Sequence, residues 1–177
     1  MSPRDEVAVF DASPLIFLSR IGLLGESLKL FKRCYVAESV REEVVGTGQT
    51  IGAPETAEIE SLVGMGGLTV ERPPRSSLAL RLESNPRLSR GDRDSLVLAF
   101  ERGGRLLADD AAVRSVASQL GIRRGGTLYV LVVLTDRHVL KPAEAVEGLD
   151  RLVDAGWYCS TRLYRTAKAA LERRGSK

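Results

Sequence analysis

The chain has 177 residues, of which 44% are hydrophobic and 28% are charged, a globular composition that excludes a disordered or fibrous chain. This length suits one hydrophobic core, so we expect a single domain over residues 1–177. The formal net charge of +3 is compatible with a polyanionic partner but identifies none. Cys34 and Cys159 lie far apart, which excludes a disulfide scaffold and a cysteine-based zinc site.

The N-terminal region contains no long uncharged apolar run, because Asp11 and Arg20 interrupt the apolar residues 7–24. This pattern argues against a signal peptide or a membrane helix, so we expect a cytoplasmic location and no membrane partner. Aromatic residues make up 5% of the chain, too few for the stacking platforms with which sheet-face RNA readers bind bases.

Short apolar runs alternate with stretches of helical spacing along the chain. Strands are predicted at residues 7–10, 34–36, 68–70 and 105–108. Helices are predicted at residues 15–30 (two short ones), 39–48, 54–63, 78–82, 89–100, 111–120, 126–134 and, as C-terminal helices over about 142–173, 143–155 and 161–173. The alternation predicts an α/β fold, in which helices cover both faces of a parallel sheet as a three-layer α/β/α sandwich.

Several local patterns add detail to this outline. Ser39 and Glu42 have the spacing of a capping box that begins a helix. Residues 121–127 are expected to end one helix and begin the next, without a strand. The very apolar residues 128–134 indicate either a buried helix or a partner-facing one, and the second alternative favours a homodimer. Trp157 and Tyr158 are expected to pack in the interior.

Acidic residues follow two of the predicted strands. Asp11 follows the first strand, and Asp109 and Asp110 follow the fourth. In parallel sheets the ligand site lies beyond the carboxyl ends of the strands. Helix N-termini point to the same edge, so Glu43 and Asp94 can reach it from the first turns of their helices. The alternatives are that Asp11 and Asp110 only cap helices and that Glu43 is a solvated residue.

Carboxylates that converge in one place repel each other and raise their own pKa values. Such a cluster therefore requires a cation. Ligands that are all oxygen, without histidine or cysteine, select a hard ion such as Mg²⁺ or Mn²⁺. An ion of this kind can activate water and stabilise charge on a phosphodiester, which makes phosphodiester hydrolysis the leading hypothesis.

Basic residues are concentrated between residues 72 and 93, where six arginines occur. A solvated surface and a phosphate-binding surface explain them equally well. Arg90 and Arg93 lie beside the helix acids, and Arg123 and Arg124 lie in a glycine-rich turn. These four residues are our candidates for nucleic-acid binding.

An ordered set of motifs resembles the PIN-domain superfamily, and within it a VapC-like prokaryotic branch. The motifs are Asp11-Ala-Ser13-Pro-Leu15, Val40-x-x-Glu43, Gly91-Asp92-Arg93-Asp94, Leu106-Leu-Ala-Asp109-Asp110 with Arg114, and Gly126-Thr127-Leu128. The resemblance spans nearly the whole chain, including residues 149–157.

The resemblance implies a sheet of four or five parallel strands and a Mg²⁺ or Mn²⁺ centre. The implied ligands are Asp11, Glu43, Asp94 and Asp110, with Asp92 and Asp109 beside them and with Ser13, Arg114 and Thr127 in supporting positions. The implied activity is that of an endoribonuclease for single-stranded RNA, as found in the toxin of a toxin–antitoxin pair. An antitoxin protein is then an expected partner.

One departure from the family pattern leaves other functions open. Asp92 and Asp94 stand where this branch usually has glutamates, and the side chain that is one carbon shorter has less reach. A catalytically degenerate module that binds RNA or protein is therefore an alternative. A phosphatase or phosphotransferase with Asp11 as nucleophile is a third, but such enzymes usually carry a second acid where this chain has Ser13.

Overall fold

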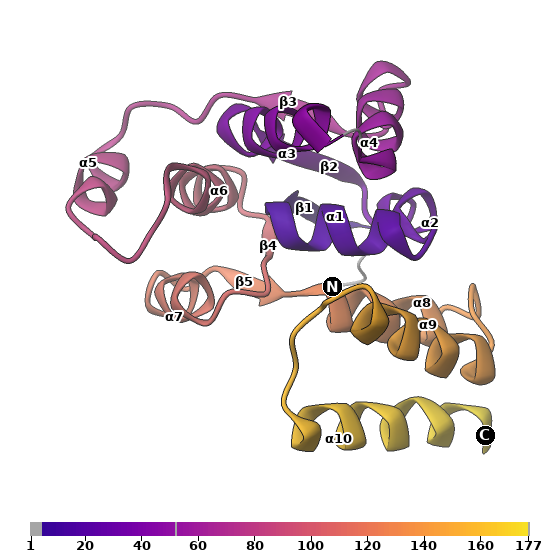
Figure 1. Ribbon diagram of the computed structural model, residues 1–177. Helices are drawn as coiled ribbons and strands as arrows, with labels where there is room; N and C mark the ends of the chain where they lie inside the picture. Colours follow the sequence, from indigo (N-terminus) through magenta and orange to yellow (C-terminus); the bar gives the residue numbers. More distant parts are fainter. Residues whose placement is uncertain (1–4, 52, 177) are drawn as a thin grey trace.

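The computed structural model describes residues 5–51 and 53–176, so the expected domain over residues 1–177 includes positions 1–4, 52 and 177 that lie outside the described residues. A five-stranded parallel sheet with the strand order β3-β2-β1-β4-β5 forms its centre (Figure 1). The strands are β1 (Val7–Phe10), β2 (Arg33–Ala37), β3 (Thr69–Glu71), β4 (Arg105–Leu107) and β5 (Arg123–Gly125). The predicted α/β fold with a parallel sheet is confirmed.

Helices cover both faces of this sheet. Those between β1 and β3 are α1 (Ala12–Arg20), α2 (Leu24–Leu28), α3 (Glu38–Ile51) and α4 (Pro54–Gly64). Those between β3 and β5 are α5 (Ser77–Glu83), α6 (Arg90–Glu101) and α7 (Ala111–Gln119). After β5 follow α8 (Thr127–Asp136), α9 (Pro142–Asp154), α10 (Thr161–Glu172) and a 3-10 turn, η2 (Arg173–Ser176).

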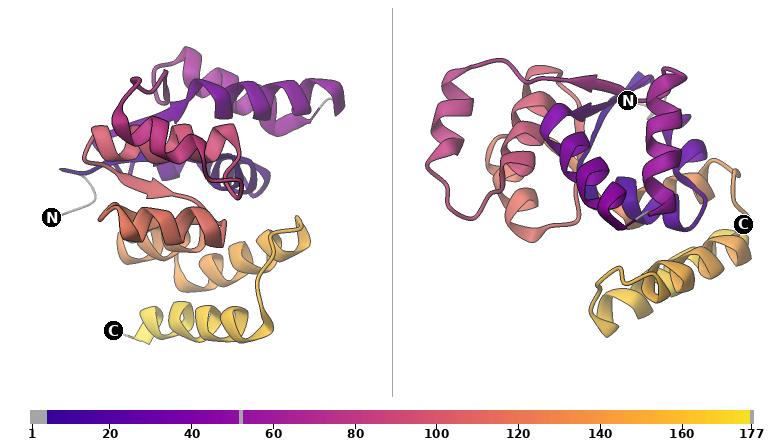
Figure 2. Two further views of the ribbon diagram at one scale, coloured as in Figure 1. Left: turned by 90° about the vertical axis from the view of Figure 1, so that its left-hand side faces the viewer. Right: turned by 45° about the horizontal axis from the view of Figure 1, so that its top comes forward.

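The layers follow from the direction of the crossovers. Figure 1 shows α6 and α7 on one side of the sheet and α1, α2 and α8 on the other. The chain moves outward from β1 to β3 and then returns across the sheet to β4, which reverses the covered face because parallel crossovers are right-handed. Helix α10 packs on α9 and lies farthest from the sheet (Figure 2).

The core lies around β1, the central strand. Ala8, Val9 and Phe10 are fully buried, as a strand covered on both faces requires. The first polar residue after this apolar run, Asp11, lies just beyond the end of the strand. A second apolar cluster joins α8 to α9 and α10 and contains Leu131, which is also fully buried.

Helix α8 settles the two alternatives for the apolar residues 128–134. Val130, Leu131 and Leu134 are fully buried inside the chain, so the buried alternative describes this helix. None of the described helices has the length and apolar character needed to cross a membrane.

Four local predictions were wrong. Residues 123–125 form strand β5, which pairs with β4, although no apolar run indicated a strand. The capping box at Ser39 is absent, because α3 already begins at Glu38 and the Ser39 hydroxyl bonds to Asp94 instead. Helix α3 also continues past 46–48 to Ile51. Tyr158, expected in the interior, is 91% exposed.

Candidate functional site

Asp11 is a buried carboxylate at the carboxyl edge of the sheet. It follows β1, its amide donates to the carbonyl of Leu107 at 2.9 Å, and only 6% of the residue is exposed. The Ser95 hydroxyl, on α6, donates to its Oδ1 at 3.2 Å. Asp11 occupies the N-cap position of α1, but its side chain makes no capping hydrogen bond to the first turn. The helix-cap alternative therefore does not describe Asp11.

The pKa of Asp11 is raised from 3.8 to about 7. Burial is the largest cause, and the charge of Asp92 is the second; Glu43 adds a smaller increase. The neighbouring Ala12 amide and the hydrogen bond from Ser95 act in the opposite direction. The structure thus brings Asp92 and Glu43 close enough to Asp11 for their charges to act on its carboxylate.

Asp92 and Glu43 reach this place from α6 and α3. Asp92 lies in the first turn of α6, where it forms a capping box with Ser89: the Ser89 amide donates to Asp92 Oδ2 at 2.7 Å. Glu43 lies in the second turn of α3, with an exposed side chain. Gly91 permits the close approach of the two helices, since a Cβ there would lie 3.1 Å from Glu43 Oε2 and 3.2 Å from Val40 Cγ2.

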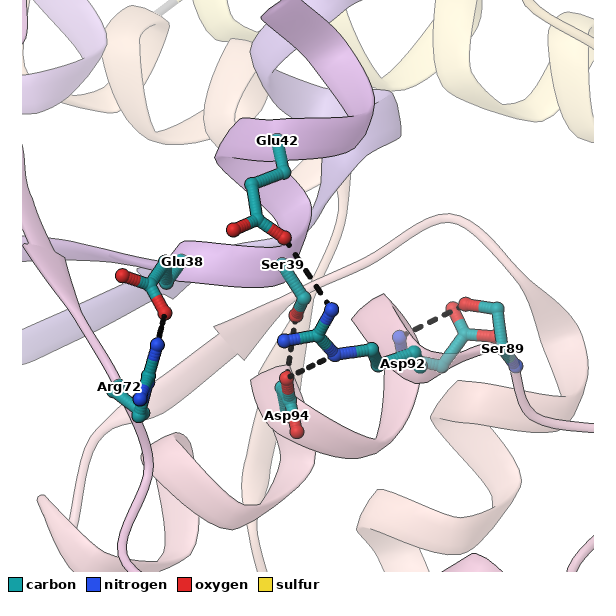
Figure 3. A network of polar contacts seen from close by, with 8 residues as sticks. Glu38, Ser39, Glu42, Arg72, Ser89, Asp92 and Asp94 are labelled. Carbon is teal, nitrogen blue, oxygen red and sulfur yellow. Dashed lines mark hydrogen bonds and ion pairs between the residues drawn. The ribbon is translucent and has the colours of Figure 1, made fainter. Parts of the chain in front are cut away.

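Asp94 lies two residues further along α6, on a different side of the helix, and has other partners. Its Oδ2 accepts a hydrogen bond of 2.5 Å from the Ser39 hydroxyl and lies 3.8 Å from Nε of Arg90 (Figure 3). Arg90 also pairs with Glu42 at 3.3 Å. Asp94 is not among the main causes of the raised pKa of Asp11. Asp92 is therefore the helix acid that interacts with Asp11, and Asp94 ties α6 to α3.

Asp109, at the end of β4, is fully engaged in holding other segments. Its Oδ1 accepts from the Thr127 amide at 2.8 Å, and its Oδ2 accepts from the Thr127 hydroxyl at 2.6 Å and from the Trp157 indole at 3.1 Å. Gly126 makes this packing possible, because a Cβ there would lie 2.4 Å from Asp109 Oδ1. Thr127, predicted as a supporting residue of the site, thus bonds to Asp109.

Asp110 is exposed and caps α7. Its Oδ1 accepts hydrogen bonds from the amides of Ala112 and Val113 at 2.7 and 3.0 Å. The cap alternative thus describes the hydrogen bonds of Asp110. Ser13 lies half-buried in the first turn of α1, two residues after Asp11.

The acids are near one another but do not form a ready cation site. Within residues 5–51 and 53–176, no three side chains among histidine, cysteine, aspartate and glutamate are close enough together to hold a metal ion. Asp11, Glu43 and Asp92 offer oxygen ligands only, the donor set of a hard ion. Side-chain rotations are needed to bring the exposed Glu43 and the partly exposed Asp92 onto an ion at Asp11.

The arginines predicted to bind nucleic acid have different surroundings. Arg90 is paired with acids, and Arg93 donates to the carbonyl of Glu83 at 3.1 Å. Arg123 pairs with the buried Glu6 at 2.5 Å and donates to the carbonyl of Gly103. The side chain of Arg124 has no partner among the described residues.

Three side chains that bond to the acids of the site were not predicted as site residues: Ser39, Ser95 and Trp157. Ser95 lies four residues after Gly91 on α6, so helical spacing could have placed it on the face of Gly91. Ser39 was expected only as a capping residue. Trp157 was correctly expected to be buried, but its bond to Asp109 joins residues 48 positions apart in the sequence and gave no local signal.

The chain has recognisable relatives. A family model of the PIN domain matches residues 7–173. Among solved structures, the chain is similar to a PilT N-terminus domain protein from the hyperthermophilic archaeon Sulfolobus solfataricus, with 18% identity and a TM-score of 0.49. That likeness covers 72% of this chain and 92% of the archaeal one. No curated protein matches the chain.

The match to the PIN-domain family model confirms the resemblance to the PIN superfamily. The matched region takes in all five strands and every acid discussed above, from Asp11 to Asp110. The chain therefore belongs to the PIN-domain family.

Proposed function

We propose that this chain is a Mg²⁺- or Mn²⁺-dependent endonuclease that hydrolyses phosphodiester bonds in single-stranded RNA. PIN domains are usually nucleases and typically bind divalent metal ions. The observation that supports the proposal is the buried Asp11, whose pKa is raised to about 7 by burial and by the neighbouring acids. An uncompensated buried carboxylate is costly unless a cation binds it.

The donor set fits a hard divalent ion. Asp11, Asp92 and Glu43 would hold it, because the charges of Asp92 and Glu43 act on Asp11 and none of the main causes of the Asp11 pKa shift is a basic side chain. Asp94 and Asp110 belong to the wider set implied by the family resemblance. One oxygen of each already accepts hydrogen bonds, from Ser39 and from the first turn of α7, respectively. A bound Mg²⁺ or Mn²⁺ supplies activation of water and neutralises charge that develops on the phosphate.

The chain's own residues prepare this place. Ser95 orients Asp11 through Oδ1, and Ser89 holds Asp92 at the start of α6. Because the pKa of Asp11 is raised only to about 7, its carboxyl group can lose its proton to a binding cation at physiological pH. Arg90, which is 64% exposed beside these acids, can leave Glu42 to meet a phosphate of the substrate.

A cleavage assay tests the proposal. The purified chain is mixed with a single-stranded RNA oligonucleotide and Mn²⁺, and Asp11→Asn and Asp92→Asn are compared with the unchanged chain. Each variant should lose more activity than the roughly 10–100-fold that is typical when an outer-shell partner of a metal site is lost. Asp154→Asn is the matched control. Asp154 is exposed on α9, so this variant should cleave normally. Undiminished cleavage by Asp11→Asn rejects the proposed centre.

A second candidate is a PIN-like module that binds RNA or protein without cutting. It is favoured by the partners of Asp94, Asp109 and Asp110, and by the absence of a ready three-ligand group among the described residues. Calorimetric titration with Mn²⁺ distinguishes the two. The nuclease requires Mn²⁺ affinity that Asp11→Asn abolishes, whereas the binding module should have none that depends on Asp11.

The biological setting is a further part of this proposal. We place the chain in the VapC-like branch, as one PIN-like domain acting in the cytoplasm as the toxin of a toxin–antitoxin pair, with an antitoxin protein as its inhibitor. Induced expression of the unchanged chain should then arrest bacterial growth, and Asp11→Asn should not. Equal growth of both cultures would remove the toxin role while leaving the nuclease activity to the cleavage assay.

A further inference from the structure

A polar groove runs between α7 and the edge strand β5. Helix α7 and β5 lie side by side at the end of the sheet (Figure 1). The groove has a volume of about 390 Å³ and is lined by Asp109, Ala111, Arg114, Ser115, Ser118 and Arg124. We call it the β5–α7 groove. It begins at Asp109 on the carboxyl edge, where β4 lies directly beside β1 and therefore beside Asp11.

The lining of the groove comes from one face of α7. Positions 111, 114, 115 and 118 are three or four residues apart, which places their side chains in one row along the helix. Arg124 faces this row from β5. Two guanidinium groups and two hydroxyl groups therefore line one depression, all of them hydrogen-bond donors.

The two arginines of the groove have no acidic partner among the described residues. Neither Arg114 nor Arg124 makes a side-chain hydrogen bond or ion pair with any described residue. Their neighbour in the strand, Arg123, is held by the buried Glu6, which also pairs with Arg105 at 2.9 Å. Uncompensated guanidinium groups that face one depression create a local positive potential that attracts an anion.

Asp109 keeps its negative charge, but the two guanidinium groups of the groove outnumber it. Both of its oxygens accept hydrogen bonds, from Thr127 and Trp157, so they are turned to donors of the chain. The arginines, in contrast, are exposed and have all their donors available. Guanidinium groups bind phosphate oxygens in a bidentate way, which suits a phosphate in this groove.

From these observations we propose that the β5–α7 groove binds a phosphate group of the nucleic-acid strand, next to the place where Asp11 lies. This inference rests on the proposed nuclease function and deepens it by naming where the RNA strand continues beyond the carboxylates. The ligand is either an internal phosphodiester or a terminal phosphate, since both offer the same oxygens. The groove thus sets the position of the strand relative to the carboxylates.

Binding measured without cleavage tests the groove. A fluorescently labelled single-stranded RNA is titrated with protein in EDTA, in two forms that carry either a 5′-hydroxyl or a 5′-phosphate. Arg114→Ala/Arg124→Ala is compared with the unchanged chain and with Lys32→Ala/Arg33→Ala. This control removes the same charge from two exposed residues at the amino end of β2, the opposite edge of the sheet.

The groove variant should bind about tenfold or more weakly, while the control stays within about threefold. Loss of the contact to this one phosphate should also lower the slope of log affinity against log salt by about 0.7. A loss shared by both RNAs assigns the groove to an internal phosphodiester, and a loss confined to the 5′-phosphate form assigns it to a terminal phosphate. Unchanged affinity and salt slope, or no RNA affinity in the unchanged chain, overturn the inference.

The outcomes separate this inference from the nuclease proposal. If the groove variant binds normally while Asp11→Asn no longer cleaves, the groove assignment is wrong and the nuclease stands. If the groove variant loses affinity although the unchanged chain never cleaves, the groove is a binding site and the nuclease proposal is wrong. Circular dichroism of each variant confirms that the chain remains folded.

Discussion

Replacing Asp11 by asparagine should make the metal-free protein more stable at high pH. The pKa of Asp11 is raised from 3.8 to about 7 in the folded chain, chiefly because the carboxylate is buried and secondly because Asp92 repels it. The folded chain therefore binds this proton more tightly than the unfolded chain. The resulting stabilisation is complete below pH 4 and is lost as the pH rises through about 7.

The size of this effect follows from the size of the shift. One pKa unit corresponds to about 1.4 kcal/mol, so Asp11 should remove about 4 kcal/mol from the free energy of unfolding between about pH 4 and pH 8. Asparagine does not ionise and keeps a polar group of nearly the same shape beside Ser95. The stability of Asp11→Asn relative to the unchanged chain should therefore rise by about the same amount across this range.

Urea unfolding at several pH values, in EDTA, measures this difference. All other groups titrate in both proteins, so the difference between the two curves isolates Asp11, and Asp154→Asn should run parallel to the unchanged chain. Mn²⁺ at about a hundred times its dissociation constant should return about 2.7 kcal/mol to the unchanged chain at pH 8 and little to Asp11→Asn. A difference that does not vary with pH would refute the burial and repulsion that we assign to Asp11.

Three further predictions concern single contacts. Asp92→Asn should lower the pKa of the buried carboxylate after β1, and Asp94→Asn should leave it unchanged, as followed by carbon NMR of the carboxyl group. Trp157→Phe removes one donor to Asp109 and should lower the free energy of unfolding by about 1–3 kcal/mol in urea; an equally stable variant would contradict the bond. Burial raises the pKa of Cys34 to about 12, so at pH 8 a thiol reagent should label this residue only after unfolding. Rapid labelling of Cys34 itself in the native chain, distinguished from the partly exposed Cys159 by peptide mapping, would contradict its burial.

The three inner strands β2, β1 and β4 were predictable because most of their residues are buried. A strand covered on both faces needs an apolar run, and the runs in β1 and β4 are each followed by an acid. Strand β5 was not predicted because it has no such run. It is an edge strand of sequence Arg-Arg-Gly, in which Arg123 is neutralised by Glu6 and Arg124 faces the groove, so tertiary pairing outweighs local sequence pattern.

The candidate site was predictable in place but less so in detail. The rule that ligand sites lie beyond the carboxyl ends of parallel strands located Asp11 correctly at that edge. The choice between Asp92 and Asp94 depends on how α6 is rotated against α3, which sequence spacing does not determine. Ser39 draws Asp94 toward α3, and the capping box with Ser89 leaves Asp92 near Asp11.

Hydrogen-bond partners separate the acids that hold the fold from those available to a cation. A carboxylate has room for about four hydrogen bonds, and those of Asp109 are directed to three donors that join β4, α8 and Trp157. A cation that bound there would have to displace bonds that the fold uses. At Asp11 the same cation would offset the repulsion from Asp92 and the free-energy cost of burying the carboxylate. Cation binding at Asp11 would therefore stabilise the fold, whereas cation binding at Asp109 would destabilise it. For this reason the metal site that we propose lies between β1, α3 and α6, and Asp109 at the end of β4 is left to hold the fold.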